Sequence, residues 1–189
     1  NDSPTAAMHL KAGSKPAHRA VQPYVIGTNA TIFAPHSGLR ISARDLAKLM
    51  MLLLNRGRYG THVLLEPATV DGMLHDAWHF NPQLWNGDSF HGRYRAWGLG
   101  LQHITGAADD LGGDLLAAGS KEQFWGHRGE AYGLLGGMWF DPQRKAGFVF
   151  LAGGVGDNPA AHQGTYSSAY SWEELIQTAV ISEIDRITN

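Results

Sequence analysis

The sequence predicts an α+β fold in which helices flank an antiparallel sheet. Apolar residues repeat at helical spacing in the first third of the chain and again at its C-terminal end. Between these stretches lie short apolar runs separated by turn residues, which is typical of strands. Helices first, strands next and a closing helix last is an order that favours α+β over alternating βαβ units. With 189 residues and a mass of 20.5 kDa, the chain has room for one core.

The opening stretch, residues 1–36, is predicted to be an irregular connection. Several prolines and glycines interrupt it, and no helical or strand period is sustained. A structureless run of this length is unusual in a self-contained domain. We therefore expect it to lie across a partner that is missing from this chain.

Residues 37–94 are predicted to form the helical part. Ser42 and Asp45 form a loose capping box, which predicts that a helix starts there and ends near Asn55. The helical spacing behind this start is carried by Leu46, Leu49, Met50 and Leu53. A second, shorter helix is predicted from Pro67, a residue that suits the first helical position, with Val70, Met73 and Leu74 on one face.

Residues 95–189 are predicted to form antiparallel strands and a closing helix. Alternation over residues 97–101 predicts one strand, and residues 105–119 are expected to be a loop. Apolar runs at 124–129, 134–140 and 146–152 predict three more strands, the last two joined as a hairpin by residues 141–145. Finally, a capping box at Ser171 and Glu174 predicts a helix whose apolar face carries Ile176, Val180, Ile184 and Ile187.

The composition excludes several classes of function. Fifteen Lys and Arg against seventeen Asp and Glu give a formal net charge of −2, so no basic field favours nucleic acid or anionic membranes. The chain has no Cys, which excludes disulfides, thiolate metal sites and a Cys nucleophile. Its longest apolar runs are shorter than the ~18 residues that span a bilayer, so we expect no membrane-spanning segment.

Residues 126–129, Gly-His-Arg-Gly, are the first candidate functional site. They fall where a strand is predicted, and glycines beside a His leave room for a ligand to approach the backbone. The residue type alone favours a half-buried structural His127 beside a bulge.

His75 and His79 are the second candidate. Two His residues four apart on one helical face have zinc-site spacing, and Asp76 between them resembles the acid of a His-Glu-x-x-His motif. Asp is shorter than Glu, however, and no third ligand is evident, so two loop histidines are the favoured interpretation.

The sequence also lacks the usual nucleophile motifs. No Ser has a Lys three residues later, and neither Gly-x-Ser-x-Gly, a dinucleotide fingerprint nor a phosphate loop occurs. We therefore expect no cofactor and no metal.

Four segments in order resemble the serine β-lactamase and penicillin-binding-protein-like hydrolases, in their class C-like branch of esterases, D-amino-peptidases and carboxypeptidases. Residues 37–46 resemble the family's Gly-Gly-Leu-x-Ser-x-x-Asp-Leu segment, with Ser37 in place of the first Gly. Residues 64–73 are similar to its Leu-Leu-(Ser)-Pro…Val…Met stretch, and residues 97–100 to its Tyr/Trp-Gly-Leu-Gly strand. Residues 126–142 resemble its Gly-His-x-Gly…Gly…Asp-Pro run.

The resemblance changes the interpretation of His127. With Gly129 it matches the family's Lys/His-x-Gly motif, on the strand that borders the active site, and by motif position the backbone N–H of Glu130 would belong to the oxyanion hole. The family's Ser-x-x-Lys and Tyr-x-Asn motifs do not occur in these 189 residues. We therefore expect a single partial domain, the C-terminal half of such an enzyme and inactive alone, whose partner is the N-terminal half.

The implied reaction is acyl transfer from a small ester, peptide or β-lactam to a Ser supplied by the absent half. An imidazole has an ordinary pKa of about 6.5 and is mostly neutral at pH 7, so His in place of Lys makes a carboxylated substrate less certain. The alternatives are a non-catalytic binding relative of the same fold and, more weakly, a zinc protein that uses His75 and His79. Family members are commonly exported, which would suggest a periplasmic or secreted location.

Overall fold

The computed structural model of the chain describes Leu39 and residues 41–109, 112–120, 123–131, 134–153 and 162–188. The opening predicted at residues 1–36 lies outside the described residues, as do residues 37 and 38 of the family-like segment. The described residues form three helices and antiparallel sheets, which confirms the predicted α+β class.

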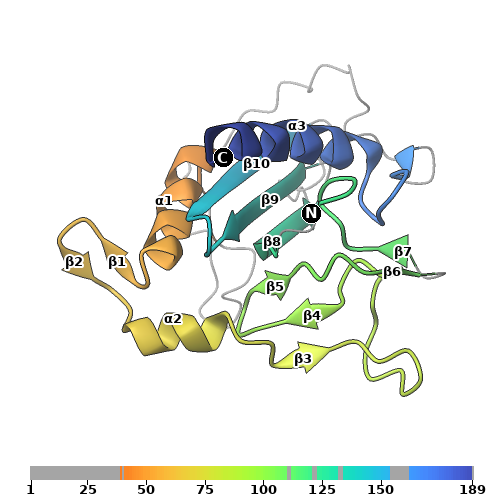
Figure 1. Cartoon of the computed structure of the whole chain (residues 1–189), viewed down its shortest axis with the longest axis horizontal. Coiled ribbons are helices and arrows are strands. Elements are labelled where there is room, and N and C mark those ends of the chain that lie inside the picture. Colours follow the sequence, from red (N-terminus) through yellow and green to blue (C-terminus); the bar gives the residue numbers. More distant parts are fainter. Residues whose placement is uncertain are drawn as a thin grey trace, which may run out of the picture.

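The main sheet has six antiparallel strands in the order β10-β9-β8-β5-β4-β3 (Figure 1). The pairs β1-β2 and β6-β7 form separate two-stranded sheets. The helices are α1 (Ala43–Leu54), α2 (Pro67–Met73) and α3 (Ser171–Thr188). The strands are β1 (Arg58–Tyr59), β2 (His62–Val63), β3 (Trp78–His79), β4 (Ala96–Trp97), β5 (Gln102–His103), β6 (Ala108–Asp109), β7 (Gly112–Gly113), β8 (Trp125–Ala131), β9 (Leu134–Asp141) and β10 (Ala146–Gly153).

The two predicted N-terminal helices are confirmed. The Ser42 hydroxyl accepts a hydrogen bond from the backbone N–H of Asp45 and so caps α1, which ends before Asn55. Pro67 is the first residue of α2, where its missing N–H costs nothing. Residues 37–94, expected to be helical, also contain β1, β2 and β3, and β3 forms one edge of the main sheet.

The single strand predicted over residues 97–101 is wrong. The chain instead forms β4 and β5, which pair with each other through a turn around Gly100, whose φ is +75°. A left-handed residue breaks strand geometry, and Gly adopts it without the penalty of a Cβ. Leu99 is 61% exposed at this turn, so the alternating pattern did not mark a buried face. The loop predicted over residues 105–119 contains the short β6-β7 pair.

The three later strands are confirmed as β8, β9 and β10. Strands β9 and β10 form the predicted hairpin, with Asp141 opposite Ala146. The Asp141 carboxylate accepts hydrogen bonds from the backbone N–H groups of Gln143 and Arg144, at 2.8 and 3.2 Å, and so stabilises the turn.

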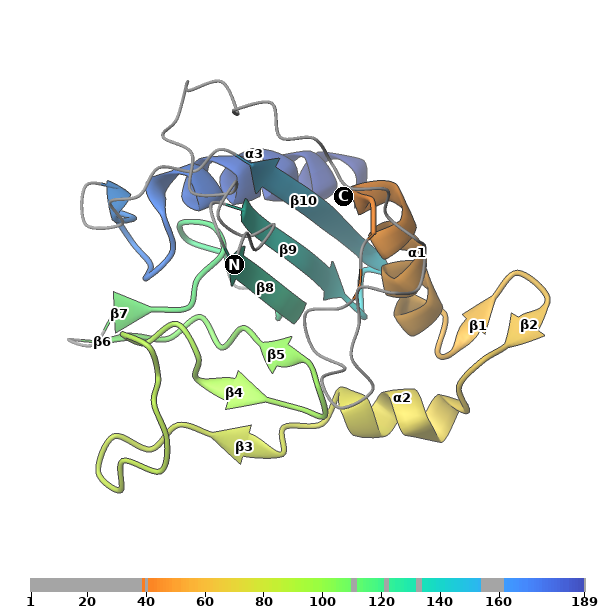
Figure 2. The same ribbon diagram turned by 180° about the vertical axis from the view of Figure 1, so that it is seen from behind.

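Side chains on the two faces of the sheet belong to two hydrophobic cores. In β9, Trp139 packs toward α3, whereas Met138 and Phe140 pack toward α1 and α2. Seen from behind, β8, β9 and β10 lie in front of α3 (Figure 2). The α3 core consists of Ile104, Leu116, Ala117, Phe124, Trp139, Phe148, Phe150, Ile181 and Ile184. The α1 core consists of Met50, Leu53, Val70, Leu101, Trp125, Met138 and Phe140.

The closing helix is confirmed, but its predicted capping box is one residue out of register. Ser171 is already helical, and the Glu173 carboxylate accepts from the backbone N–H of Tyr170, the residue before α3. Ile184 is buried as expected, whereas Ile187, in the last turn of α3, is 63% exposed.

Glu174 holds the loop that leads into α3. Its buried carboxylate accepts from the backbone N–H groups of Thr165, Tyr166 and Ser167, and from the Thr165 and Ser167 hydroxyls. Burial alone would raise the pKa of this carboxyl, but these hydrogen bonds outweigh the burial and the pKa is lowered. The loop is therefore anchored to the first turn of α3.

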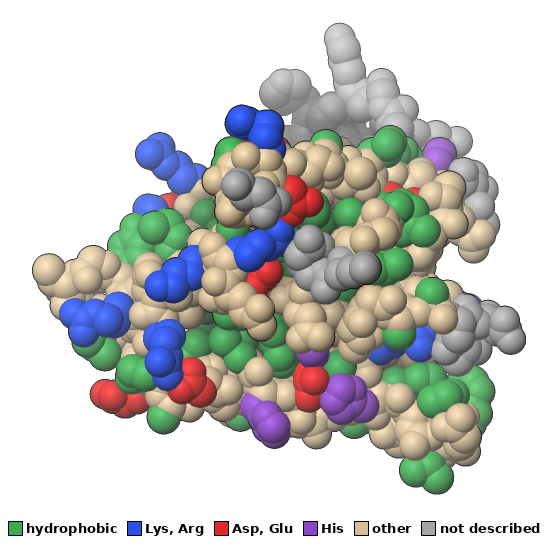
Figure 3. Space-filling model, viewed as in Figure 1, with side chains coloured by type: hydrophobic (Ala, Val, Ile, Leu, Met, Phe, Trp, Pro, Cys, Tyr) green, Lys and Arg blue, Asp and Glu red, His purple; other side chains and the backbone are tan. Residues whose placement is uncertain are grey.

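Charged side chains of both signs are interspersed on the face shown in Figure 3. Most of the basic side chains visible there lie over α1 and the β1-β2 pair, with acidic side chains nearby. Within the described residues, no helix is both long enough and apolar enough to cross a bilayer.

Candidate active site

Strand β8 has one fully paired edge and one partly open edge. It pairs with β9 from Trp125 to Ala131, but with β5 only at Trp125 and Gly126. Among the described strands, none pairs with the second edge of β8 from His127 onward. Because backbone N–H groups alternate between the two edges of a strand, this stretch presents donors to the open edge. The strand therefore offers a ligand a backbone surface beside His127.

His127 lies at the start of the open edge with its ring held in place. Its Nδ1 lies 2.5 Å from the carbonyl oxygen of Arg128. A carbonyl only accepts, so in the neutral imidazole Nδ1 carries the proton and Nε2 is left as an acceptor. The Trp97 ring contacts the His127 ring edge-to-face, with centroids 5.2 Å apart. The exposed His127 is thus an oriented polar group rather than the half-buried structural residue that its type alone favoured.

The two glycines that flank His127 and Arg128 have different surroundings. A Cβ on Gly126 would lie 1.8 Å from the carbonyl oxygen of Met138, so this position is closed by the neighbouring strand. A Cβ on Gly129 would meet nothing within 4 Å. The open space expected on both sides of His127 is therefore present only at Gly129, because β9 and Trp139 pack against Gly126.

The side chain of Glu130 is held in place by two partners. Its carboxylate accepts from Arg93 Nη1 at 3.1 Å and from the Tyr170 hydroxyl at 2.6 Å. Burial is the main reason why the pKa of Tyr170 is raised to about 12, and the hydrogen bond to Glu130 is the second reason. This hydroxyl therefore stays protonated at neutral pH. We refer to Arg93, Glu130 and Tyr170 as the Glu130 clamp. It ties the end of β8 to the residue that precedes α3.

Arg128 points to the opposite face of the sheet. It is only 5% exposed, and its guanidinium lies 5.6 Å from the centre of the Trp139 ring. Burial lowers the pKa of this group, against the opposing effect of the Glu173 charge. Of the residues in the motif, only His127 and Gly129 therefore face the α1 side.

Sequence reasoning placed His127, Gly129 and Glu130 together, but it missed Arg93 and Tyr170. These two residues contact Glu130 from positions 37 and 40 residues away. No local motif marks either of them, since the contact depends on where the chain passes β8.

The Beta-lactamase family model matches residues 2–170, most of the chain. The chain belongs to the Beta-lactamase family. No curated protein and no solved structure matches it. The family match confirms the resemblance inferred from the four segments and supports a hydrolase-type fold. The roles of His127, Gly129 and Glu130 stay predictions.

The zinc alternative loses its geometric basis in this Beta-lactamase family chain. Helix α2 ends at Met73, so His75 lies in a turn and His79 in β3, and the two do not share a helical face. Asp76 instead accepts from His103 Nδ1 at 2.9 Å and lies 3.3 Å from His79 Nε2. Within the described residues, no group of three or more His, Asp or Glu is arranged to hold a metal ion.

Proposed function

We propose that this chain is the C-terminal part of a serine hydrolase that transfers an acyl group from an ester, amide or β-lactam. The observation that carries the proposal is the open edge of β8, with His127 oriented beside it and Gly129 unobstructed. Membership of the Beta-lactamase family supports the same reaction class. The nucleophilic Ser and its Lys belong to a polypeptide segment outside these 189 residues, since no Ser-x-x-Lys occurs here.

In the proposed reaction, this chain supplies electrostatic stabilisation and orientation. The nucleophilic Ser oxygen attacks the substrate carbonyl, and its proton passes to the Lys and Tyr of the other segment. The negative charge that develops on the carbonyl oxygen is stabilised by the backbone N–H of Glu130, at the end of the open edge. The leaving group takes up the proton, and water then attacks the acyl-enzyme and releases the acid.

His127 is proposed to orient the substrate. Because its Nδ1–H is donated to the Arg128 carbonyl, Nε2 is the atom available to accept from a donor such as an amide N–H or a hydroxyl of the substrate. An Nε2 that accepts at this position favours a hydrogen-bond donor of the substrate over a carboxylate.

Covalent labelling tests the proposal directly. The 189-residue chain is incubated with a fluorophosphonate probe, and so is a polypeptide in which the chain is preceded by its natural upstream coding region. We expect no labelling of the chain and labelling of a Ser-x-x-Lys serine in the longer protein. Labelling of a serine in the isolated chain would refute the proposal. An upstream region without Ser-x-x-Lys would instead favour a non-catalytic binding relative.

Two substitutions at Glu130 test the oxyanion role in the longer protein. Glu130→Ala keeps the backbone N–H and should change kcat by only a few fold, whereas Glu130→Pro removes the donor and should lower kcat by ~10² to 10³. Circular dichroism and thermal melts must show that the Pro variant keeps its strand, because Pro also disturbs ladders. If Glu130→Ala is as damaging as Glu130→Pro, the carboxylate is the active group and the oxyanion assignment is wrong.

A further inference from the structure

The peptide groups of β8 alternate between its two edges, and this alternation decides which edge the Glu130 N–H faces. The backbone N–H of Ile104, which follows β5, donates to the carbonyl oxygen of Phe124 at 2.8 Å. The peptide groups of Phe124 therefore face the β5 side, and so do those of every second residue from there to Glu130. Because none of the described strands pairs with this side beyond Gly126, the N–H of Glu130 is directed at the open edge.

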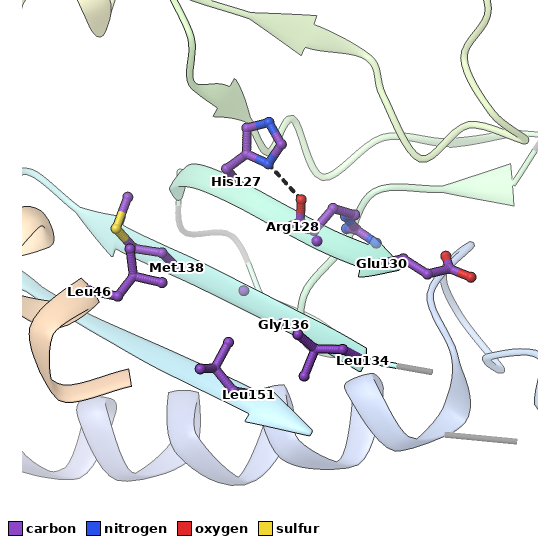
Figure 4. Close-up of a pocket in the computed structure, with 10 residues that line it drawn as sticks. Leu46, His127, Arg128, Glu130, Leu134, Gly136, Met138 and Leu151 are labelled. Carbon is purple, nitrogen blue, oxygen red and sulfur yellow. Dashed lines mark hydrogen bonds between the residues drawn. The ribbon is translucent and has the colours of Figure 1, made fainter. Parts of the chain in front are cut away.

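The side chain of Glu130 lies on the α3 face of the sheet. Side chains two residues apart share a face of a strand, and Arg128 packs over Trp139 in the α3 core. In Figure 4 the Glu130 side chain leaves β8 at its C-terminal end, away from the His127 ring. The Glu130 clamp therefore holds this residue from the α3 face, whereas its N–H faces the open edge.

Within the described sheet, the peptide group of Glu130 is not held by strand pairing. Strand β9 bonds to the peptide groups of β8 that face it, which are those of His127, Gly129 and Ala131. The groups of Glu130 face the other edge, where none of the described strands pairs. The orientation of this N–H therefore depends on the neighbouring residues in the chain and on the Glu130 side chain.

The two partners of Glu130 are themselves held in place. Arg93 donates from Nε and Nη2 to the carbonyl oxygen of Ser168, at 3.1 and 2.6 Å, which leaves Nη1 to donate to Glu130. Its guanidinium also lies 5.8 Å from the centre of the Tyr170 ring. Tyr170 is only 6% exposed, and its backbone N–H donates to the Glu173 carboxylate at 2.9 Å. A side chain bonded to two fixed partners restricts its own backbone as well.

We propose that Arg93 and Tyr170 are positioning residues, which hold the Glu130 N–H in the orientation that receives the substrate carbonyl oxygen. The inference rests on the proposed function, in which this N–H stabilises the developing negative charge. Such a donor is most effective when it is oriented before the reaction, because reorienting it costs part of the stabilisation. The Glu130 clamp supplies that orientation from the α3 face, in place of strand pairing.

Amide ¹⁵N relaxation in the 189-residue chain tests the positioning without any need for catalysis. Tyr170→Phe removes one oxygen atom and should lower the order parameter of the Glu130 N–H from the ~0.85 of a rigid backbone toward ~0.6. The N–H of Gly126, in the paired part of β8, is the internal reference and should not change. An unchanged order parameter at Glu130 in a folded Tyr170→Phe would overturn the proposal.

Tyr166→Phe is the matched control. It removes a hydroxyl from the same loop before α3, but this hydroxyl lies 2.8 Å from the Thr178 hydroxyl instead of contacting Glu130. The variant should lose some free energy of unfolding and leave the Glu130 order parameter unchanged. If Tyr166→Phe loosens the Glu130 N–H as much as Tyr170→Phe does, the effect is a general loss of stability and the positioning role is refuted.

Arg93→Lys tests the other partner and does not depend on the Tyr170 variant. A Lys ammonium lacks the planar fork with which Arg93 reaches Ser168 and Glu130 at once. The Glu130 order parameter should therefore fall in this variant too. A value equal to that of the parent in a folded Arg93→Lys would remove Arg93 from the proposal.

Kinetics of the longer protein connect the orientation to the reaction. Tyr170→Phe should lower kcat and kcat/KM by the same factor, about threefold to fivefold, because the Glu130 N–H acts in the transition state and not in substrate binding. Tyr166→Phe should leave both unchanged. Glu130→Ala combined with Tyr170→Phe should lower kcat no further than Glu130→Ala alone, since Tyr170 acts through the Glu130 carboxylate. A further loss in the double variant would contradict the proposal.

The two measurements separate this inference from the proposed function. If the longer parent protein does not hydrolyse p-nitrophenyl acetate, acyl transfer is refuted, and the restraint on the Glu130 N–H still stands or falls with its order parameter. If the ester is hydrolysed and Tyr170→Phe changes neither the order parameter nor kcat, the positioning role is refuted and acyl transfer stands. A looser Glu130 N–H with an unchanged kcat would also refute the positioning role, because its orientation would then not matter to the reaction.

Discussion

The two halves of β8 are neighbours in one strand, yet they have opposite surroundings. Trp125 and Gly126 pair with strands on both edges, and Gly126 lies directly against the carbonyl of Met138. Among the described strands, β9 alone pairs with residues 127–131, and Gly129 borders open space. Because a slip of one residue would move every side chain to the opposite face, the closed half fixes the register that places His127 on the open half. The same strand therefore combines a structural anchor with a candidate binding edge.

The open half has an anchor of its own, built from side chains rather than from strand pairing. The Glu130 clamp connects the end of β8 to Tyr170, and the loop before Tyr170 is held by Glu174. Close backbone packing in the closed half leaves no room for a larger side chain. Hydrogen bonds between half-exposed side chains in the open half contribute less to the free energy of unfolding. Substitutions should therefore cost more in the closed half than in the open half.

The largest expected effect is at Gly126. Gly126→Ala would place a Cβ 1.8 Å from the Met138 carbonyl oxygen and 2.8 Å from Trp139, so β8 and β9 must separate. Overpacking of this kind typically costs 1 to 3 kcal/mol, and we expect about 3 kcal/mol here because the contact is with backbone. Urea denaturation measures the loss in free energy of unfolding.

Gly72→Ala in α2 is the control, because a Cβ there meets nothing within 4 Å. It should not lower the free energy of unfolding, since Ala favours a helix over Gly. An unchanged urea midpoint for Gly126→Ala would show that the closed half is not closely packed.

Most of the elements could be predicted from the sequence because their signals are local. Ser42 caps α1, Pro67 starts α2, and the apolar runs of β8, β9 and β10 fall between turn residues. The turn between β4 and β5 was missed, because alternation of apolar residues and glycines imitates a strand when the left-handed φ of Gly100 is not visible. Local patterns fail where backbone conformation or distant packing decides.

The candidate site, too, has features that the sequence indicated and features that it did not. His127, Gly129 and Glu130 are adjacent and form a motif, so the sequence indicated them together. The difference between Gly126 and Gly129 depends on β9 and on where β5 stops pairing, which the motif does not encode. The spacing of His75 and His79 was misleading, because α2 ends at Met73 and the helical face it required does not exist.

Removal of the Tyr170 hydroxyl should have an intermediate effect. Tyr170→Phe breaks the 2.6 Å hydrogen bond to Glu130, and bonds to charged groups contribute roughly 1.5 to 3 kcal/mol. Because the Glu130 side chain is 46% exposed, we expect a loss of only about 1 kcal/mol at pH 7. The amide of Glu130 should also exchange with deuterium faster, since the open half loses an anchor.

Alkaline pH provides a second measurement of the same contact. The pKa of Tyr170 is raised from its ordinary value of 10 to about 12, so the folded state holds this proton more tightly than the unfolded state. The resulting stability is present below pH 10 and is lost as the pH rises toward 12. Tyr170→Phe should lose less stability over this range than the parent. Tyr59→Phe, on the exposed strand β1, is the control and should retain the parental slope of the free energy of unfolding against pH. The same slope in all three proteins would contradict the role assigned to Tyr170.

The smallest expected effect is at Gly129, in the open half of β8. Its backbone is not left-handed and a Cβ would meet nothing within 4 Å, so Ala fits without strain. Ala also restricts the unfolded chain more than Gly, which favours folding by about 0.4 to 1 kcal/mol where the native backbone is compatible. We therefore expect Gly129→Ala to unfold at a urea concentration equal to or slightly above that of the parent, in contrast to Gly126→Ala. If both alanine variants unfold equally early, the strand is closed along its whole length, and the proposed open edge cannot receive a substrate.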